Sequence, residues 1–196
     1  MDLKNRSDRW GAVSQVLHWA ILVLLVWIAW LGLGMVDMPN TPAKIGTYAL
    51  HKSLGLTLLA LVAARLAWRL YAGAPSPVVG TPRWQARIAS LTHVALYGLM
   101  FAIPLSGWLF NSASGYPLQW FKRFNLPALS GRDQGLADVA AGIHEYGFWL
   151  LVALVALHAA AALYHHVAQR DDTLTRMLPA LPRRRSTAPS ESESLT

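Results

Sequence analysis

The sequence predicts an all-α integral membrane protein that folds as a four-helix bundle. Of its 196 residues, 54% are apolar and only 14% are charged, whereas a soluble domain carries roughly 25% charged residues. Several segments are long and apolar enough to be candidates for membrane spans. The chain contains no cysteine, which excludes disulfides, iron–sulfur clusters and c-type haem attachment. The formal net charge is +7, but the basic residues flank the apolar segments, so we expect membrane lipid and no nucleic acid as a partner.

The spanning helices follow from the stretches that contain no Asp, Glu, Lys or Arg. A membrane span needs about 20 residues, and three of these stretches are that long. One of them, 88–121, also leaves room for a loop at 111–121. The stretch 53–64 is shorter, and it becomes long enough if Lys52 and Arg65 near its ends extend their charges toward the headgroups. We therefore predict a transmembrane domain over residues 13–168. Its helices are expected at about 13–36, 46–70, 88–110 and 142–168.

The distribution of basic residues predicts the orientation of these helices. Twelve Lys and Arg residues lie on the side that holds both chain ends, against five on the other side. Because cytoplasmic loops carry the excess of Lys and Arg, we expect residues 1–12 and the tail 169–196 in the cytoplasm. The tail is predicted to be disordered from about residue 183, where it is polar without apolar periodicity. The loops expected on the outer side are 37–45 and 111–141.

The seven histidines carry the functional argument, because ionisable residues inside a membrane are rare and usually functional. With the amino terminus inside, His18 and His158 lie in the inner halves of their predicted helices, whereas His51 and His144 lie near the outer starts of theirs. His144 and His158 are separated by 14 residues, which is ~21 Å along a helix and within ~40° of a whole number of turns. Both imidazoles therefore face one side of the last helix, and each is opposed at its own depth by a histidine from another helix.

Two histidine pairs at two depths predict two haem b groups. Each inferred site has two histidines and no pair of carboxylates, whereas zinc takes about four ligands and di-iron sites take several Glu. Two trans imidazoles complete a six-coordinate haem iron, which has no open position and suits electron transfer. We therefore expect His18 and His158 to ligate the iron of an inner haem, and His51 and His144 that of an outer haem. Space for the macrocycles is expected beside Gly55, Gly107, Gly142, Ala159, Ala160, Ala161 and Ala162.

Other roles for the histidines are open at this point. A single membrane histidine is often a hydrogen-bond partner between helices, and we expect that role for His93 and His166. His165 lies ~20° from the face of His158 and closer to the cytoplasm, so a haem propionate or a quinone oxygen is its expected partner. The alternative class is a histidine-lined metal transporter or a structural bundle, either of which would bind no haem.

Five blocks in order resemble the bacterial cytochrome b561 family over nearly the whole chain, from about Arg9 to Pro179. The blocks are QVLHWAILVLL (15–25), LHKSLGLTLL (50–59), THVALYGLMFAIPLSGW (92–108), IHEYGFWLL (143–151) and LHAAAALYHHVAQRDDTLTRMLP (157–179). The resemblance implies a multi-pass protein of the bacterial inner membrane that binds two haem b groups. It also implies the ligand set, which matches His18, His51, His144 and His158.

The resemblance implies an activity as well. By likeness to the superoxide oxidases of this family, superoxide would be oxidised to dioxygen at the outer haem, and the electron would pass through the inner haem to ubiquinone. A local positive field would steer the anionic substrate. The candidates for steering are Lys52, Lys122 and Arg123, and no further catalytic residue is assigned. The candidate quinone or propionate contacts are Arg65, Arg69 and His165. The alternative is a di-haem electron carrier between a dehydrogenase partner protein and the quinone pool.

Overall fold

The computed structural model describes residues 2–78 and 80–179. The elements in chain order are α1 (Ala12–Val36), α2 (Pro42–Ala72), α3 (Arg83–Ala113), β1 (Leu118–Trp120), β2 (Phe124–Leu126), α4 (Gln134–Val167) and the 3-10 helix η1 (Thr175–Met177). All four α-helices are long and apolar enough to cross a membrane, so the prediction of an all-α bundle with four membrane-spanning helices is confirmed. The predicted disorder from about residue 183 lies outside the described residues.

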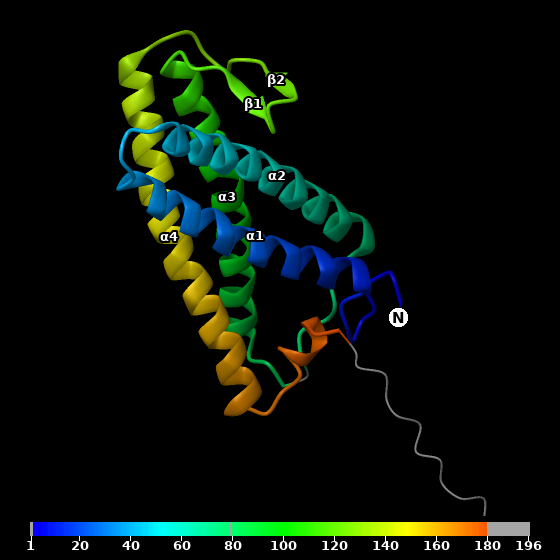
Figure 1. The fold of residues 1–196 in the computed structure, drawn as a ribbon. Helices are drawn as coiled ribbons and strands as arrows, with labels where there is room; N and C mark the ends of the chain where they lie inside the picture. The colour runs from blue at the N-terminus through cyan, green and yellow to red at the C-terminus, as the bar shows by residue number, and fades with distance from the viewer. Residues whose placement is uncertain (1, 79, 180–196) are drawn as a thin grey trace, which may run out of the picture.

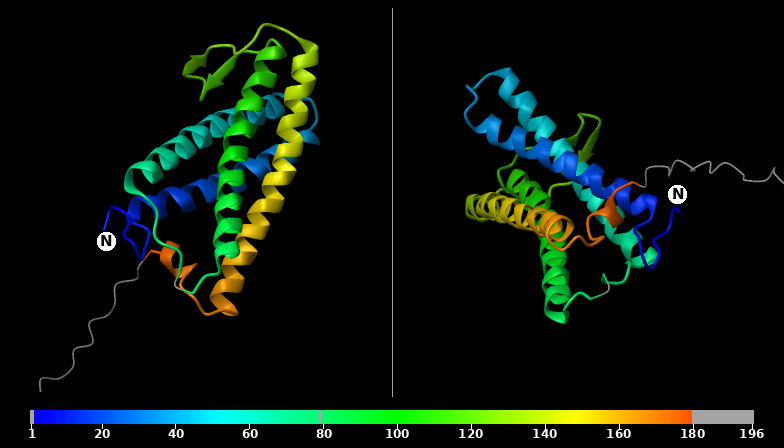
Figure 2. Two further views of the ribbon diagram at one scale, coloured as in Figure 1. Left: turned by 180° about the vertical axis from the view of Figure 1, so that it is seen from behind. Right: turned by 90° about the horizontal axis from the view of Figure 1, so that it is seen from below.

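The helices form two antiparallel pairs. Figure 1 shows α3 and α4 side by side, with α1 and α2 crossing them as a second pair, and the view from behind in Figure 2 shows the same crossing. The two pairs meet through α2 and α3. One end of the bundle, called the terminal end here, carries residues 2–11, the connection between α2 and α3, and η1. The opposite end, called the hairpin end, carries the antiparallel strands β1 and β2.

The helices are longer than their apolar stretches predict. α2 begins at Pro42, where the missing proline N–H costs no helical hydrogen bond, and α4 begins directly after Asp133, whose Oδ1 accepts a hydrogen bond from the Leu136 N–H at 3.0 Å. Hydropathy marks only the part of a helix that lies in lipid, whereas the helix itself continues until a cap or a turn ends it. The prediction that His51 and His144 lie near helix starts is therefore wrong, because both lie about two and a half turns inside their helices.

Residues 169–179, which belong to the predicted tail, fold back onto the start of α1. The indole Nε1 of Trp19 donates a hydrogen bond to the carbonyl of Met177 at 3.0 Å. The guanidinium of Arg9 donates to the carbonyl of Leu178 at 2.9 Å. This part of the chain therefore closes the terminal end of the bundle.

The N-terminal segment packs against the same end. It passes so close to the start of α1 that a Cβ at Gly11 would lie 2.5 Å from the carbonyl oxygen of Leu3, so only glycine fits there. The Asn5 side-chain amide donates to the carbonyl of Gly73 at 2.7 Å, which ties the segment to the end of α2. Three segments that are far apart in the sequence thus meet at the terminal end.

The apolar side chains face two environments. A small core joins α1 and α2 through Ile21, Leu58 and Val62, with partly buried side chains of α3 packed against it. Large side chains on the outside of the spans are exposed, such as Trp30 at 72% and Tyr146 at 76%. Such surfaces would be unfavourable in water, and they fit a protein whose surrounding solvent is lipid.

The N-cap of α4 gives a test of the fold. Replacing Asp133 by Ala removes the acceptor for the Leu136 N–H, and we expect this to lower the free energy of unfolding by about 1 kcal/mol. Replacing it by Asn keeps a capping oxygen and should cost only a few tenths of that amount, because Asn and Asp cap about equally well. Thermal unfolding of both variants in detergent measures the difference. Equal loss in the two variants would show that the cap is not the stabilising contact.

Candidate functional site

The structure brings His51 and His144 together inside the bundle, toward the hairpin end. Their ring centroids lie 6.1 Å apart with an angle of 69° between the ring planes. The Nδ1 atom of His144 lies 2.8 Å from the carbonyl oxygen of Ile103 on α3. Because a carbonyl can only accept, Nδ1 carries the proton, and the lone pair of Nε2 is left available for a ligand.

A second pair, His18 and His158, lies toward the terminal end. Their ring centroids are 6.4 Å apart, and the angle between the ring planes is again 69°. The structure therefore places side by side the histidines that the depth argument pairs, and α4 contributes one member of each pair.

The spacing of both pairs fits a haem iron between the rings. With bonds of about 2.0–2.1 Å from metal to imidazole nitrogen, two trans imidazoles place their ring centroids roughly 6 Å apart, which matches both pairs. A Cβ at Gly55, one turn beyond His51, would meet no atom within 4 Å, so there is open space beside this pair. The Nδ1 atom of His51 is buried and makes no hydrogen bond within the described part of the chain. No group of three or more metal-ligating side chains converges among the described residues, whereas a closed zinc site takes about four ligands.

The structure corrects the role expected for His93. Its ring centroid lies 5.3 Å from that of His158, so this histidine does have a neighbour at its own depth. This neighbour was missed from the sequence because the predicted helix starts at residue 88, five residues after the observed start at Arg83. The expected depth of His93 in the membrane shifts with that start. At 5.3 Å the two rings are too close to share one iron in trans, which needs roughly 6 Å. His93 is thus a neighbour of the His18 and His158 pair, while His166 is exposed in the last turn of α4.

The three candidate contacts near the terminal end lie in different surroundings. The Nε atom of Arg65 donates to the hydroxyl oxygen of Tyr97 at 3.1 Å. The guanidinium of Arg69 lies 5.6 Å from the ring centroid of Trp10, an arrangement typical of a cation–π contact. Tyr97 was not singled out in the sequence, although it lies one helical turn from His93, and that spacing is the signal that could have found it.

His165 pairs with a carboxylate through one of its two ring nitrogens. Its Nδ1 atom lies 2.6 Å from Oδ2 of Asp171. Burial raises the pKa of Asp171, but hydrogen bonds from Thr173 and His165 outweigh burial and hold that pKa below its ordinary value. This hydrogen bond joins the end of α4 to the segment that folds back on α1, so His165 contributes to the closure of the terminal end.

The candidate steering residues lie around one stretch of α2 at the hairpin end. The Nζ atom of Lys52 donates to Oδ1 of Asn111 at 2.8 Å. Next to it, the Phe121 N–H donates to Oγ of Ser53 at 3.0 Å, which holds the turn between β1 and β2 against α2. Phe121 and Lys122 occupy this turn with φ values of 47° and 58°, a conformation that costs a residue other than glycine roughly 1–2 kcal/mol. The strained turn places Lys122, with Arg123 directly after it, beside the segment that carries Lys52.

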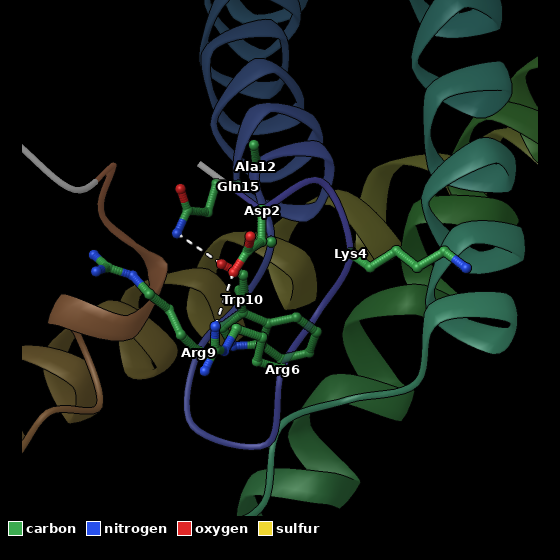
Figure 3. A pocket seen from close by; sticks show the side chains of 8 residues that line it. Asp2, Lys4, Arg6, Arg9, Trp10, Ala12 and Gln15 are labelled. Atoms are coloured by element: carbon green, nitrogen blue, oxygen red, sulfur yellow. Dashed lines mark hydrogen bonds and ion pairs between the residues drawn. The ribbon is translucent and has the colours of Figure 1, made fainter.

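Two hollows lie outside the histidine pairs. A small pocket of about 180 Å³ lies at the terminal end, and Figure 3 shows the side chains that line it. Two of them, Asp2 and Arg6, form an exposed ion pair of 3.1 Å. A groove of about 930 Å³ follows α1 beside Trp19 and is lined by apolar side chains and Gln15, without a charged residue. None of the four predicted haem ligands lines either hollow.

Comparison with known proteins decides the family. The family described as Prokaryotic cytochrome b561 matches residues 9–180. The chain belongs to this family. It is 35% identical over 182 residues to Cytochrome b561 homolog 2 of Escherichia coli (strain K12), covering 91% of this chain and 95% of that relative. It is 33% identical over 177 residues to Cytochrome b561 homolog 1 of the same organism, covering 88% and 98%, and 29% identical over 166 residues to Probable superoxide oxidase CybB of Yersinia pestis, covering 83% and 92%.

Membership of the cytochrome b561 family confirms the resemblance of the five sequence blocks. It makes the chain a multi-pass membrane protein of electron transfer that uses b-type haem. The number of haems and the ligand set stay predictions, and the two histidine pairs are the residues that fit such groups.

The pairing can be tested by haem content. Replacing His51 by Ala in this cytochrome b561 should remove one haem and leave the other, because His144 would lose its partner while His18 and His158 keep theirs. The pyridine haemochrome assay on the purified variant measures haem per chain. The matched variant, His93 to Ala, should keep the wild-type content. Complete haem loss in the His51 variant alone would contradict the pairing.

Proposed function

We propose that this protein is a di-haem b cytochrome of the bacterial inner membrane that oxidises superoxide on the periplasmic side and reduces ubiquinone. The observation that supports it most is the presence of two histidine pairs at the separation of trans ligands, both built on α4. His51 and His144 would hold the outer haem, and His18 and His158 the inner one. Both chain ends lie in the cytoplasm in this proposal, since the side that holds them carries the excess of Lys and Arg.

The reaction balances over two turnovers. Two superoxide anions each lose one electron to become dioxygen, and one ubiquinone takes up the two electrons with two protons to become ubiquinol. Bound haems supply one-electron transfer between the two sides of the membrane. The polypeptide itself would hold those groups, guide an anion to one end of the bundle and bind a quinone near the other end.

Substrate approach is assigned to the cations at the hairpin end. Lys52, Lys122 and Arg123 lie on or beside one stretch of α2, where their fields add for a small anion. The turn that carries Lys122 keeps a strained backbone, and strained conformations persist where the surrounding contacts hold them in place. That rigidity would keep the positive charge at a fixed position beside the stretch of α2 that carries His51.

Quinone contact is assigned to Arg65 at the inner end. This arginine lies in a membrane-spanning helix, donates to Tyr97, and pairs with no carboxylate among the described residues. A cation at this depth is costly unless an acceptor pairs with it, and a quinone carbonyl or a haem propionate would be such an acceptor. Arg69 and His165 are engaged with Trp10 and Asp171, so we assign them a supporting role.

Removal of the outer charge tests the substrate. Replacing Lys122 and Arg123 by Gln should lower the second-order rate with superoxide severalfold, at the low end of the ~10–10³ that steering supplies, and should flatten its dependence on ionic strength. Stopped-flow reduction of the haems by superoxide at several salt concentrations measures both. The matched control replaces Arg83 and Arg87 by Gln, which removes the same charge from the terminal end. Haem content should equal wild type in both variants.

The alternative function is an electron carrier between a dehydrogenase partner and the quinone pool. Its support is the hydrogen bond from Lys52 to Asn111, which engages part of the outer positive charge inside the protein. An unchanged rate and salt slope in the charge variant, with both haems retained, would favour the carrier. So would the absence of superoxide-driven quinone reduction by the isolated wild-type protein.

Arg65 provides a separate test of the acceptor end. If Arg65 binds the quinone, replacing it by Gln should raise the KM for ubiquinone by about tenfold, the effect of one charge-assisted hydrogen bond, with an unchanged haem spectrum. If it binds a propionate, the variant should instead show a lowered potential of the inner haem at an unchanged KM, because a cation near the iron favours reduction. Quinone titrations and redox titrations of the same preparation separate these results.

A further inference from the structure

Two glycines lie directly against the imidazoles of the pair near the hairpin end. A Cβ built on Gly107 of α3 would lie 3.1 Å from both Cε1 and Nδ1 of His144. A Cβ built on Gly32 of α1 would lie 3.1 Å from Cε1 of His51. Gly107 thus makes room for an imidazole, a role that was not assigned to it from the sequence. Gly32 was not singled out in the sequence.

The same spacing recurs on both helices. Gly107 follows Ile103 by four residues, and Gly32 follows Ile28 by four residues. In an α-helix the carbonyl of residue i points toward residue i+4, so a glycine at i+4 leaves that carbonyl open to a side chain from a neighbouring helix. The carbonyl of Ile103 accepts from His144 at 2.8 Å. Nδ1 of His51 is buried beside Gly32 and makes no hydrogen bond within the described part of the chain.

We infer that Gly32 and Gly107 are positioning residues for the outer haem ligands. Each glycine lets the imidazole from the partner helix lie against a helix backbone. For His144 this brings Nδ1 to the Ile103 carbonyl and leaves Nε2 available for a ligand. A carbonyl partner at Nδ1 fixes the tautomer and makes the imidazole a stronger donor to a metal. This inference rests on the proposed ligand role of His51 and His144.

In an alanine variant of Gly107 or Gly32, the added methyl group would displace the imidazole ring that lies against the glycine. A contact of 3.1 Å is tighter than ordinary van der Waals contact, so the ring must move by a few tenths of an ångström. The ring of His144 is held on one side by the Ile103 carbonyl, and a bound iron would hold the other side. The displacement therefore falls on the hydrogen bond, on the iron–nitrogen bond, or on both.

The test compares Gly107→Ala and Gly32→Ala with matched controls on the same helices. The controls are Gly98→Ala on α3 and Gly34→Ala on α1, where a Cβ would meet no atom within 4 Å. Haem per chain, the low-spin ferric EPR spectrum and a redox titration are measured on purified protein. Gly107→Ala and Gly32→Ala should disturb one and the same haem, by loss of that haem or by a shifted EPR signal with a raised midpoint potential, since a weaker donor favours the reduced iron. The other haem, and both haems of the controls, should match wild type.

Three results would overturn the inference. The first is wild-type EPR and potentials in both glycine variants. The second is a disturbance of a different haem by each variant. The third is loss of both haems from both variants with intact controls, which would mean that the glycines serve helix packing alone. Wild-type protein without two haems would instead refute the proposed function, so the two failures are distinguishable.

Discussion

Paired imidazoles inside a membrane are the constraint on which the rest of this structure depends. An ionisable side chain in lipid is costly unless it faces a partner in the bundle interior, and here the partners come from different helix pairs. α4 contributes His144 and His158, so it must run through the whole bundle and present one face at two depths. α1 and α2 are antiparallel, which brings His18 toward the terminal end and His51 toward the hairpin end. The crossing of the two helix pairs in Figure 1 lets each of them reach α4 at its own depth.

The two ends of the bundle are built from different chemistry. At the terminal end, indole, amide and guanidinium donors bind backbone carbonyls of segments that are far apart in sequence, such as Trp19 with Met177. These bonds close the end. At the hairpin end, a strained turn holds Lys122 and Arg123 against α2, and their charges are not paired with carboxylates among the described residues. Lys122 and Arg123 therefore supply a local positive charge beside α2, although the larger number of Lys and Arg residues lies toward the terminal end.

The sequence predicts the parts of this structure that depend on a single helix. The four spans follow from hydropathy, and the shared face of His144 and His158 follows from helical periodicity. The surroundings of those residues depend on how helices cross, which no single-helix pattern contains. His93 therefore receives a neighbour that the pattern does not predict, and Gly32 is recognisable only when the ring of His51 lies against it. The strained turn at Phe121 and Lys122 is also unpredictable, because neither residue type favours a positive φ.

The two histidine pairs differ in what surrounds them, and the difference bears on the direction of electron flow. Near the hairpin end, His144 donates from Nδ1 to a carbonyl, which strengthens an imidazole as a donor and stabilises oxidised iron. Near the terminal end, Arg65 donates to Tyr97, one helical turn from His93, whose ring lies against that of His158, and a cation in a medium of low dielectric constant stabilises an added electron. Both effects would make a haem held near the terminal end easier to reduce than one held near the hairpin end. With haems held by these pairs, an electron received at the hairpin end would pass toward Arg65 in the favourable direction, which is the direction that the proposed reduction of a quinone near the terminal end requires.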